Sequence, residues 1–71
     1  MAINIYHSHS DEVTIFYYGD TIEGKALTEK RFDTMDKLAE HMVDKIVKHN
    51  FILAMARSNE TGEVLITVKR S

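Results

Sequence analysis

Residues 34–56 read TMDKLAEHMVDKIVKHNFILAMA, and this stretch decides the fold. Its first part carries apolar residues at spacings of three and four, which is the pattern of an amphipathic helix. The apolar stripe consists of Met35, Leu38, Ala39, Met42, Val43 and Ile46. Asp33 or Thr34 can cap the first turn, and Asn50 suits the left-handed conformation that ends many helices. We therefore predict a helix over residues 34–49.

The second part of the stretch, residues 51–56, is apolar at every position. A short run of this kind, directly after a capped helix, is typical of a strand that is buried on both faces in the centre of a sheet. A loop with a glycine at position 62 follows, and then a segment rich in β-branched residues at 64–68. The sequence therefore predicts two strands joined by a hairpin after the helix.

Three further strands are expected before the helix. Residues 3–6 and 13–18 are rich in β-branched and aromatic side chains, and residues 25–32 form a weaker, more polar segment that suits the edge of a sheet. The predicted order is thus βββαββ. It corresponds to an α+β domain over residues 1–71, with the helix packed on one face of an antiparallel or mixed five-stranded sheet.

Length and composition favour a single small domain. The chain has 71 residues and no cysteine, so neither a disulfide nor a thiolate metal site can stabilise it. The sequence contains no apolar run long enough to cross a bilayer, and it begins without the features of a signal peptide. We therefore expect a cytoplasmic protein that does not act at a membrane.

Charge is distributed unevenly along the chain. Residues 1–24 carry four acidic side chains and no lysine or arginine, whereas residues 25–71 carry nine basic and seven acidic side chains. An acidic N-terminal hairpin is suited to a basic protein surface, and it makes nucleic acid an unfavoured partner. Alternatively, the asymmetry does no more than support solubility.

Alternation along the strands divides their side chains between two faces. We expect seven β-branched residues to face the helix, namely Ile3, Ile5, Val13, Ile15, Val64, Ile66 and Val68. The opposite face then carries Tyr6, Phe16, Tyr18 and Leu65. Nothing further in the chain is expected to cover them, and exposed apolar patches of this kind usually mark a partner surface. A homodimer is therefore predicted, unless the sheet curls round the helix or long polar side chains cover the aromatic rings.

The sequence offers little that indicates catalysis or a cofactor. His7 and His9, two residues apart and followed by Asp11 and Glu12, could converge on a metal ion, but these residue types are also common in turns. No nucleophile motif and no phosphate-binding glycine loop occurs. His41 is interpreted as a surface histidine on the charged side of the helix. We predict no catalytic residue, no metal and no cofactor.

Two hypotheses for function follow. The leading one is a non-enzymatic protein-interaction module, a small regulator or inhibitor of the kind found among accessory proteins of bacteria and their phages. Its expected partner-binding residues are Tyr6, Phe16, Tyr18 and Leu65 of the exposed face, with Asp11, Glu12, Asp20 and Glu23 of the acidic hairpin. The alternative is a domain that binds single-stranded nucleic acid by stacking on the same aromatic residues. Its phosphate contacts would come from Lys25, Lys30, Arg31, Lys69 and Arg70.

Overall fold

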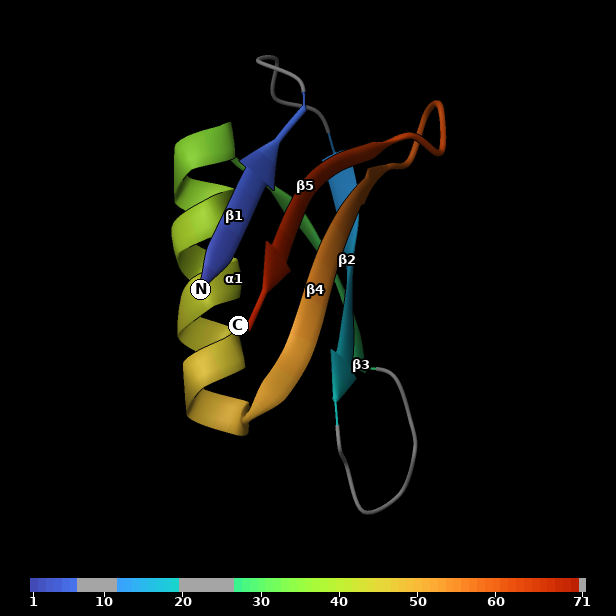
Figure 1. Cartoon of the computed structure of the whole chain (residues 1–71). Coiled ribbons are helices and arrows are strands. Elements are labelled where there is room, and N and C mark those ends of the chain that lie inside the picture. The colour runs from blue at the N-terminus through green and yellow to red at the C-terminus, as the bar shows by residue number, and fades with distance from the viewer. Residues whose placement is uncertain (7–11, 20–26, 71) are drawn as a thin grey trace.

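The computed structural model of the chain describes residues 1–6, 12–19 and 27–70. They form five strands and one helix in the predicted order βββαββ (Figure 1). The elements are β1 (Ala2–Ile5), β2 (Glu12–Gly19), β3 (Leu27–Phe32), α1 (Met35–His49), β4 (Phe51–Ser58) and β5 (Val64–Lys69). The predicted fold class is therefore confirmed.

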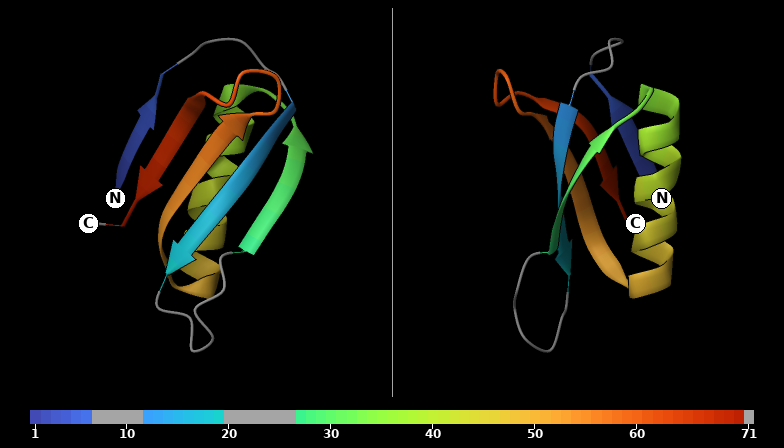
Figure 2. Two further views of the ribbon diagram at one scale, coloured as in Figure 1. Left: turned by 90° about the vertical axis from the view of Figure 1, so that its right-hand side faces the viewer. Right: turned by 180° about the vertical axis from the view of Figure 1, so that it is seen from behind.

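All five strands belong to one antiparallel sheet, in the order β1-β5-β4-β2-β3. β4 lies in the centre and β3 at an edge, as the sequence predicts for these two segments. The helix packs on one face of the sheet, and the described chain leaves the other face open (Figure 2). This two-layer arrangement determines where a site can lie.

The ends of α1 are fixed by capping groups. Thr34 is the N-cap, and its Oγ1 accepts a hydrogen bond from the main-chain N–H of Lys37 at 3.3 Å. Asn50 ends the helix in the left-handed conformation, with φ of 58°, as predicted. Among the described residues, no helix is long and apolar enough to cross a membrane.

Arg70 fastens the C-terminal end of α1 to the sheet. Its Nη2 donates to the carbonyl of Ile46 at 2.7 Å, and its Nε donates to the carbonyl of Phe51 at 3.0 Å. The Ile46 carbonyl also accepts a hydrogen bond from the main-chain N–H of Asn50, so the guanidinium adds a second donor at the helix end and joins it to the first residue of β4. Arg70 was one of the expected phosphate contacts, and the structure gives it this role within the fold instead.

The core lies between α1 and the centre of the sheet. Its fully buried side chains include Val13, Ile15, Tyr17, Leu38, Met42, Ile46, Ala54, Ala56, Ile66 and Val68. The two alanines belong to the central strand, where their small side chains allow the helix to lie close to the sheet. The predicted stripe of α1 thus provides the helical half of the core.

The prediction that Leu65 lies on the exposed face is wrong. Ala56 pairs with Ile66 and Arg57 pairs with Val64, so Leu65 is an extra residue in a β-bulge of β5. A bulge interrupts the alternation of side chains, and as a result both Leu65 and Ile66 are buried, Leu65 to 1% exposure. Leu65 therefore cannot contribute to a partner surface.

Candidate functional site

We call the surface of the sheet opposite α1 the open face, and the strand register defines its residues. Phe16 lies opposite Met55, and Tyr18 lies opposite Leu53. Directly opposed residues in an antiparallel sheet project to the same side. The apolar and aromatic side chains of the open face therefore include Tyr6, Phe16, Tyr18, Phe32, Leu53 and Met55. Val64 also belongs to this face, because it lies opposite Arg57, and the expectation that it faces the helix is wrong.

Aromatic side chains of the open face reach solvent. Phe32 is 71% exposed, and Tyr6 and Tyr18 are also exposed, whereas Phe16 is half-buried. The Tyr6 hydroxyl lies 3.4 Å from Oγ1 of Thr67, which holds its ring across β5. In the part of the chain that the structure describes, α1 packs on the other side of the sheet (Figure 2). The structure thus places Tyr6, Phe16 and Tyr18 together on one surface.

Three basic side chains share the open face. Lys30 and Arg57 both lie opposite Thr14, and Lys69 lies opposite Leu53. The Arg57 guanidinium is 5.9 Å from the centre of the Phe16 ring, a distance at which a cation is attracted to the face of an aromatic ring. The described part of the open face therefore combines aromatic rings with three basic groups, and Glu12, opposite Phe32, adds one carboxylate.

The acidic residues expected at the site are only partly described. Asp11, Asp20 and Glu23 lie outside the described residues. Glu12 is described, and its Oε1 accepts a hydrogen bond from Nδ2 of Asn59 at 2.7 Å. The carboxylate of Glu12 therefore contributes to holding the β4–β5 hairpin against the start of β2.

Sequence reasoning missed several members of the open face, namely Phe32, Leu53, Met55 and Arg57. Their place follows only from the register, because Phe32 lies opposite Glu12, and Leu53 and Met55 lie opposite Tyr18 and Phe16. Segment 51–56 is apolar on both sides, and its pattern alone does not tell which side chains point away from the helix. The neighbouring strand supplies that information.

The basic residues expected to contact phosphate are not brought together. Lys30 and Lys69 lie on the open face, whereas Arg31 lies opposite Val13 and projects to the helix side. Arg70 binds main-chain carbonyls at the helix end, and Lys25 lies outside the described residues. Arg57, which was not predicted, takes the central position on this face.

A second polar cluster lies on the helix side of the sheet. The Tyr17 hydroxyl donates a hydrogen bond to Oε1 of Glu29, and Nε2 of His41 lies 2.6 Å from the same oxygen. The interpretation of His41 as a surface histidine misses this contact with Glu29 on β3. The His41 side chain is only 24% exposed.

This cluster shifts the pKa values of two of its members. Burial, together with the hydrogen bond to Glu29, raises the pKa of Tyr17 well above its ordinary value, so the phenol stays protonated. Burial alone would raise the pKa of Glu29, but the hydrogen bonds from Tyr17 and His41 and the nearby positive charges together lower it. A protonated phenol and a carboxylate with two partners are typical of a structural cluster, and neither is activated as a nucleophile.

Within residues 1–6, 12–19 and 27–70, no group of three His, Cys, Asp or Glu side chains is arranged to hold a metal ion. His7 and His9, the pair with ligand-type spacing, lie outside the described residues.

The described residues form a small α+β domain in which α1 covers one face of the sheet and no described element covers the other. Comparisons with protein-family models, with curated proteins and with solved structures gave no match to the chain.

Proposed function

We propose that the protein is a non-enzymatic interaction module, a small regulator or inhibitor, whose open face binds another protein. The observation that supports this is that Tyr6, Phe16, Tyr18 and Phe32 share a sheet face that no described element covers. Aromatic side chains, methionine and arginine are enriched in the centres of protein interfaces, and this face carries all three kinds. A chain without cysteine is in keeping with a reducing compartment, and we place the module in the cytoplasm.

The partner that we propose first is a second copy of the chain. Two sheets can pack face to face about 10 Å apart, with their aromatic side chains interdigitated between them. A two-fold axis would bring the same patch of both copies together, and a small core gains stability from such an association.

The basic residues of the open face are compatible with this arrangement. Arg57 already lies over the Phe16 ring, where its charge is attracted to the aromatic face. Lys30 and Lys69 are exposed, and their long apolar stems allow the charged ends to reach solvent at the rim of an interface. Arg57 and Phe16 would then lie near the centre of the contact, and Lys30 and Lys69 near its edge.

Sedimentation tests this proposal directly. The wild-type chain is expected to sediment at twice the 8.2 kDa of one chain, with a mass that falls on dilution. Phe32→Asp combined with Tyr18→Asp should give a folded monomer, because two buried carboxylates without partners would oppose association. Both side chains are exposed, so the isolated domain should tolerate the changes.

The matched control is Val47→Asp. Val47 is 63% exposed and lies on α1, away from the open face. This variant should keep the wild-type mass. A monomeric wild-type chain at high concentration, or dissociation by Val47→Asp and not by the open-face variant, would refute the proposed dimer.

A second candidate function rests on a separate observation, the presence of Lys30, Arg57 and Lys69 beside the aromatic rings. Basic side chains that flank exposed rings on a sheet are typical of surfaces that bind single-stranded nucleic acid. The overall net charge of −2 opposes this function, because phosphate binding depends on excess positive charge.

Fluorescence anisotropy with a labelled oligothymidylate checks the second candidate. If two or three phosphates are neutralised, affinity should fall roughly tenfold between low and physiological salt. Arg57→Ala should weaken binding, whereas Lys37→Ala on α1 should not. No binding at low salt, or an equal loss with both variants, would rule out nucleic acid as the ligand of this face.

A further inference from the structure

A groove lies on the helix side of the sheet, between α1 and the edge strand β1. Ile3 and Ile5 lie opposite Val68 and Ile66, so all four project toward the helix layer. Val68 and Ile66 are fully buried, but Ile3 and Ile5 remain 49% and 45% exposed. The helix therefore covers β5 and stops short of β1.

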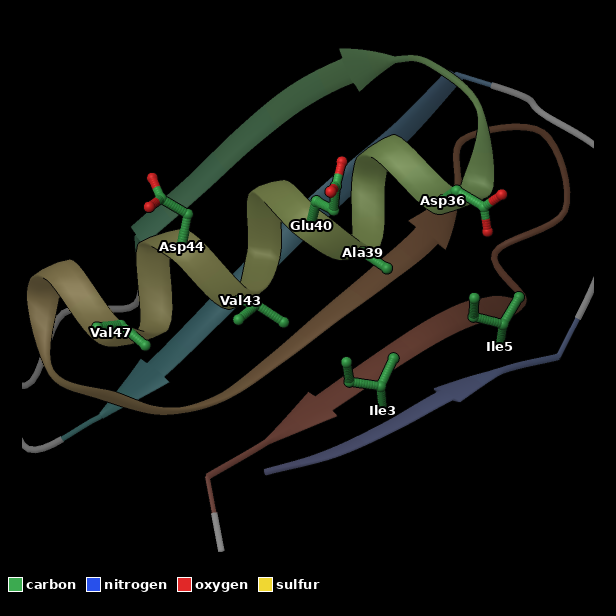
Figure 3. Close-up of a pocket in the computed structure, with 8 residues that line it drawn as sticks. All are labelled: Ile3, Ile5, Asp36, Ala39, Glu40, Val43, Asp44 and Val47. Carbon is green, nitrogen blue, oxygen red and sulfur yellow. The ribbon is translucent and has the colours of Figure 1, made fainter.

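The walls of this groove are apolar, and both elements contribute to them. Figure 3 shows Ile3 and Ile5 projecting from β1 toward α1, where they face Ala39, Val43 and Val47. The groove encloses about 780 Å³ and opens to solvent along its length. Its apolar side chains have the arrangement of a core layer from which one element is missing.

Carboxylates line the same groove. Asp36, Glu40 and Asp44 are spaced by four residues, so they lie at successive turns on the flank of α1 beside the valines. All three are exposed, and among the described residues none of them makes a hydrogen bond or an ion pair. Within residues 1–6, 12–19 and 27–70, no basic side chain lines the groove. The apolar side chains of the groove are thus combined with three negative charges that have no partner among the described residues.

We propose that this groove binds a basic amphipathic helix of another protein. Such a helix would lie beside α1 on the same face of the sheet, as a second helix of that layer. Its apolar residues, at spacings of three, four and seven, would fill the space between Ile3, Ile5 and the valines of α1. Lysine or arginine residues on its flank would pair with Asp36, Glu40 and Asp44.

The negative charge of the groove favours a basic helix over a second copy of the chain, a nucleic acid or a lipid surface. A second copy that docked by the same groove about a two-fold axis would bring two sets of carboxylates together, which is unfavourable. Nucleic acids and anionic lipid surfaces are repelled for the same reason. The binding surface lies on the opposite side of the sheet from the open face, so it is additional to the proposed function and independent of it.

The test uses a fluorescein-labelled synthetic peptide of leucine, alanine and lysine, with leucines at helical spacings of three, four and seven. Anisotropy titration of the full chain should show saturable binding. Nuclear magnetic resonance should show the largest amide shifts at Ile3, Ile5, Val43 and Val47. The same peptide with glutamate in place of lysine should not bind.

Two sets of variants test the contribution of charge. Asp36→Asn, Glu40→Gln and Asp44→Asn together should weaken binding about tenfold, which is the combined effect expected of three exposed ion pairs. The control set, Asp33→Asn, Glu60→Gln and Glu63→Gln, changes the net charge by the same amount at described positions that do not line the groove, and it should leave the affinity as it is. Ile5→Asp should abolish binding, because it places a charge among the apolar side chains of the groove. Equal losses in both sets, binding of the glutamate peptide, or shifts centred on the open face would overturn the proposal.

Discussion

Leu38→Ala is expected to remove about 3 kcal/mol from the free energy of unfolding. Leu38 is fully buried where α1 meets the sheet, and the substitution leaves a cavity that the surrounding side chains fill only in part. A chain of 71 residues has a total stability of about 4–11 kcal/mol at ordinary values per residue. The loss is therefore a large share of the total. The midpoint of urea denaturation, followed by circular dichroism, should fall strongly with an unchanged m-value.

Val47→Ala is the matched control for this prediction, because it lies on the same helix and is 63% exposed. It should alter the free energy of unfolding by no more than about 0.5 kcal/mol. Both variants are compared with the wild type at one protein concentration, since self-association would add to the apparent stability. A loss below about 1 kcal/mol in Leu38→Ala would show that α1 does not pack on the sheet as described.

The elements predicted with most success are those whose signals are local. The helix is specified by its apolar stripe, by the Thr34 cap and by the left-handed Asn50, and all of these are read from adjacent residues. The hairpin loop is indicated by Gly62, which adopts a φ of 77°. The central position of β4 follows from a segment that is apolar on both sides.

The errors arise where side chains depend on a partner strand. Leu65 follows a regular alternation in the sequence. Only the pairing of β5 with β4 reveals that Leu65 is the extra residue of a bulge and that its side chain is buried. The groove beside β1 was likewise not predicted. Ile3 and Ile5 do face the helix layer, but the width of the sheet relative to the helix decides whether they are covered. Neither pairing nor width is encoded in a short stretch of residues.

The same limit applies to the cluster of Tyr17, Glu29 and His41. The three residues come from β2, β3 and α1, and only the register of β2 with β3 brings Glu29 beside Tyr17 on the helix side. Because Glu29 accepts two hydrogen bonds as a carboxylate, its pKa is lowered in the folded state. The folded protein therefore gains stability from this group above the unfolded pKa near 4.5, and loses it as the pH falls through the folded pKa.

Glu29→Gln is expected to cost about 2 kcal/mol at neutral pH, the usual effect of weakening hydrogen bonds to a charged group. Since the variant has no carboxylate at this position, the cost should shrink as the pH falls through the folded pKa of Glu29, until variant and wild type converge. Urea denaturation at a series of pH values measures this difference. Glu40→Gln, an exposed carboxylate without a partner among the described residues, should cost no more than about 0.5 kcal/mol at neutral pH. If the difference in free energy of unfolding between Glu29→Gln and the wild type stays the same at acidic pH, the carboxylate charge is not what Tyr17 and His41 stabilise.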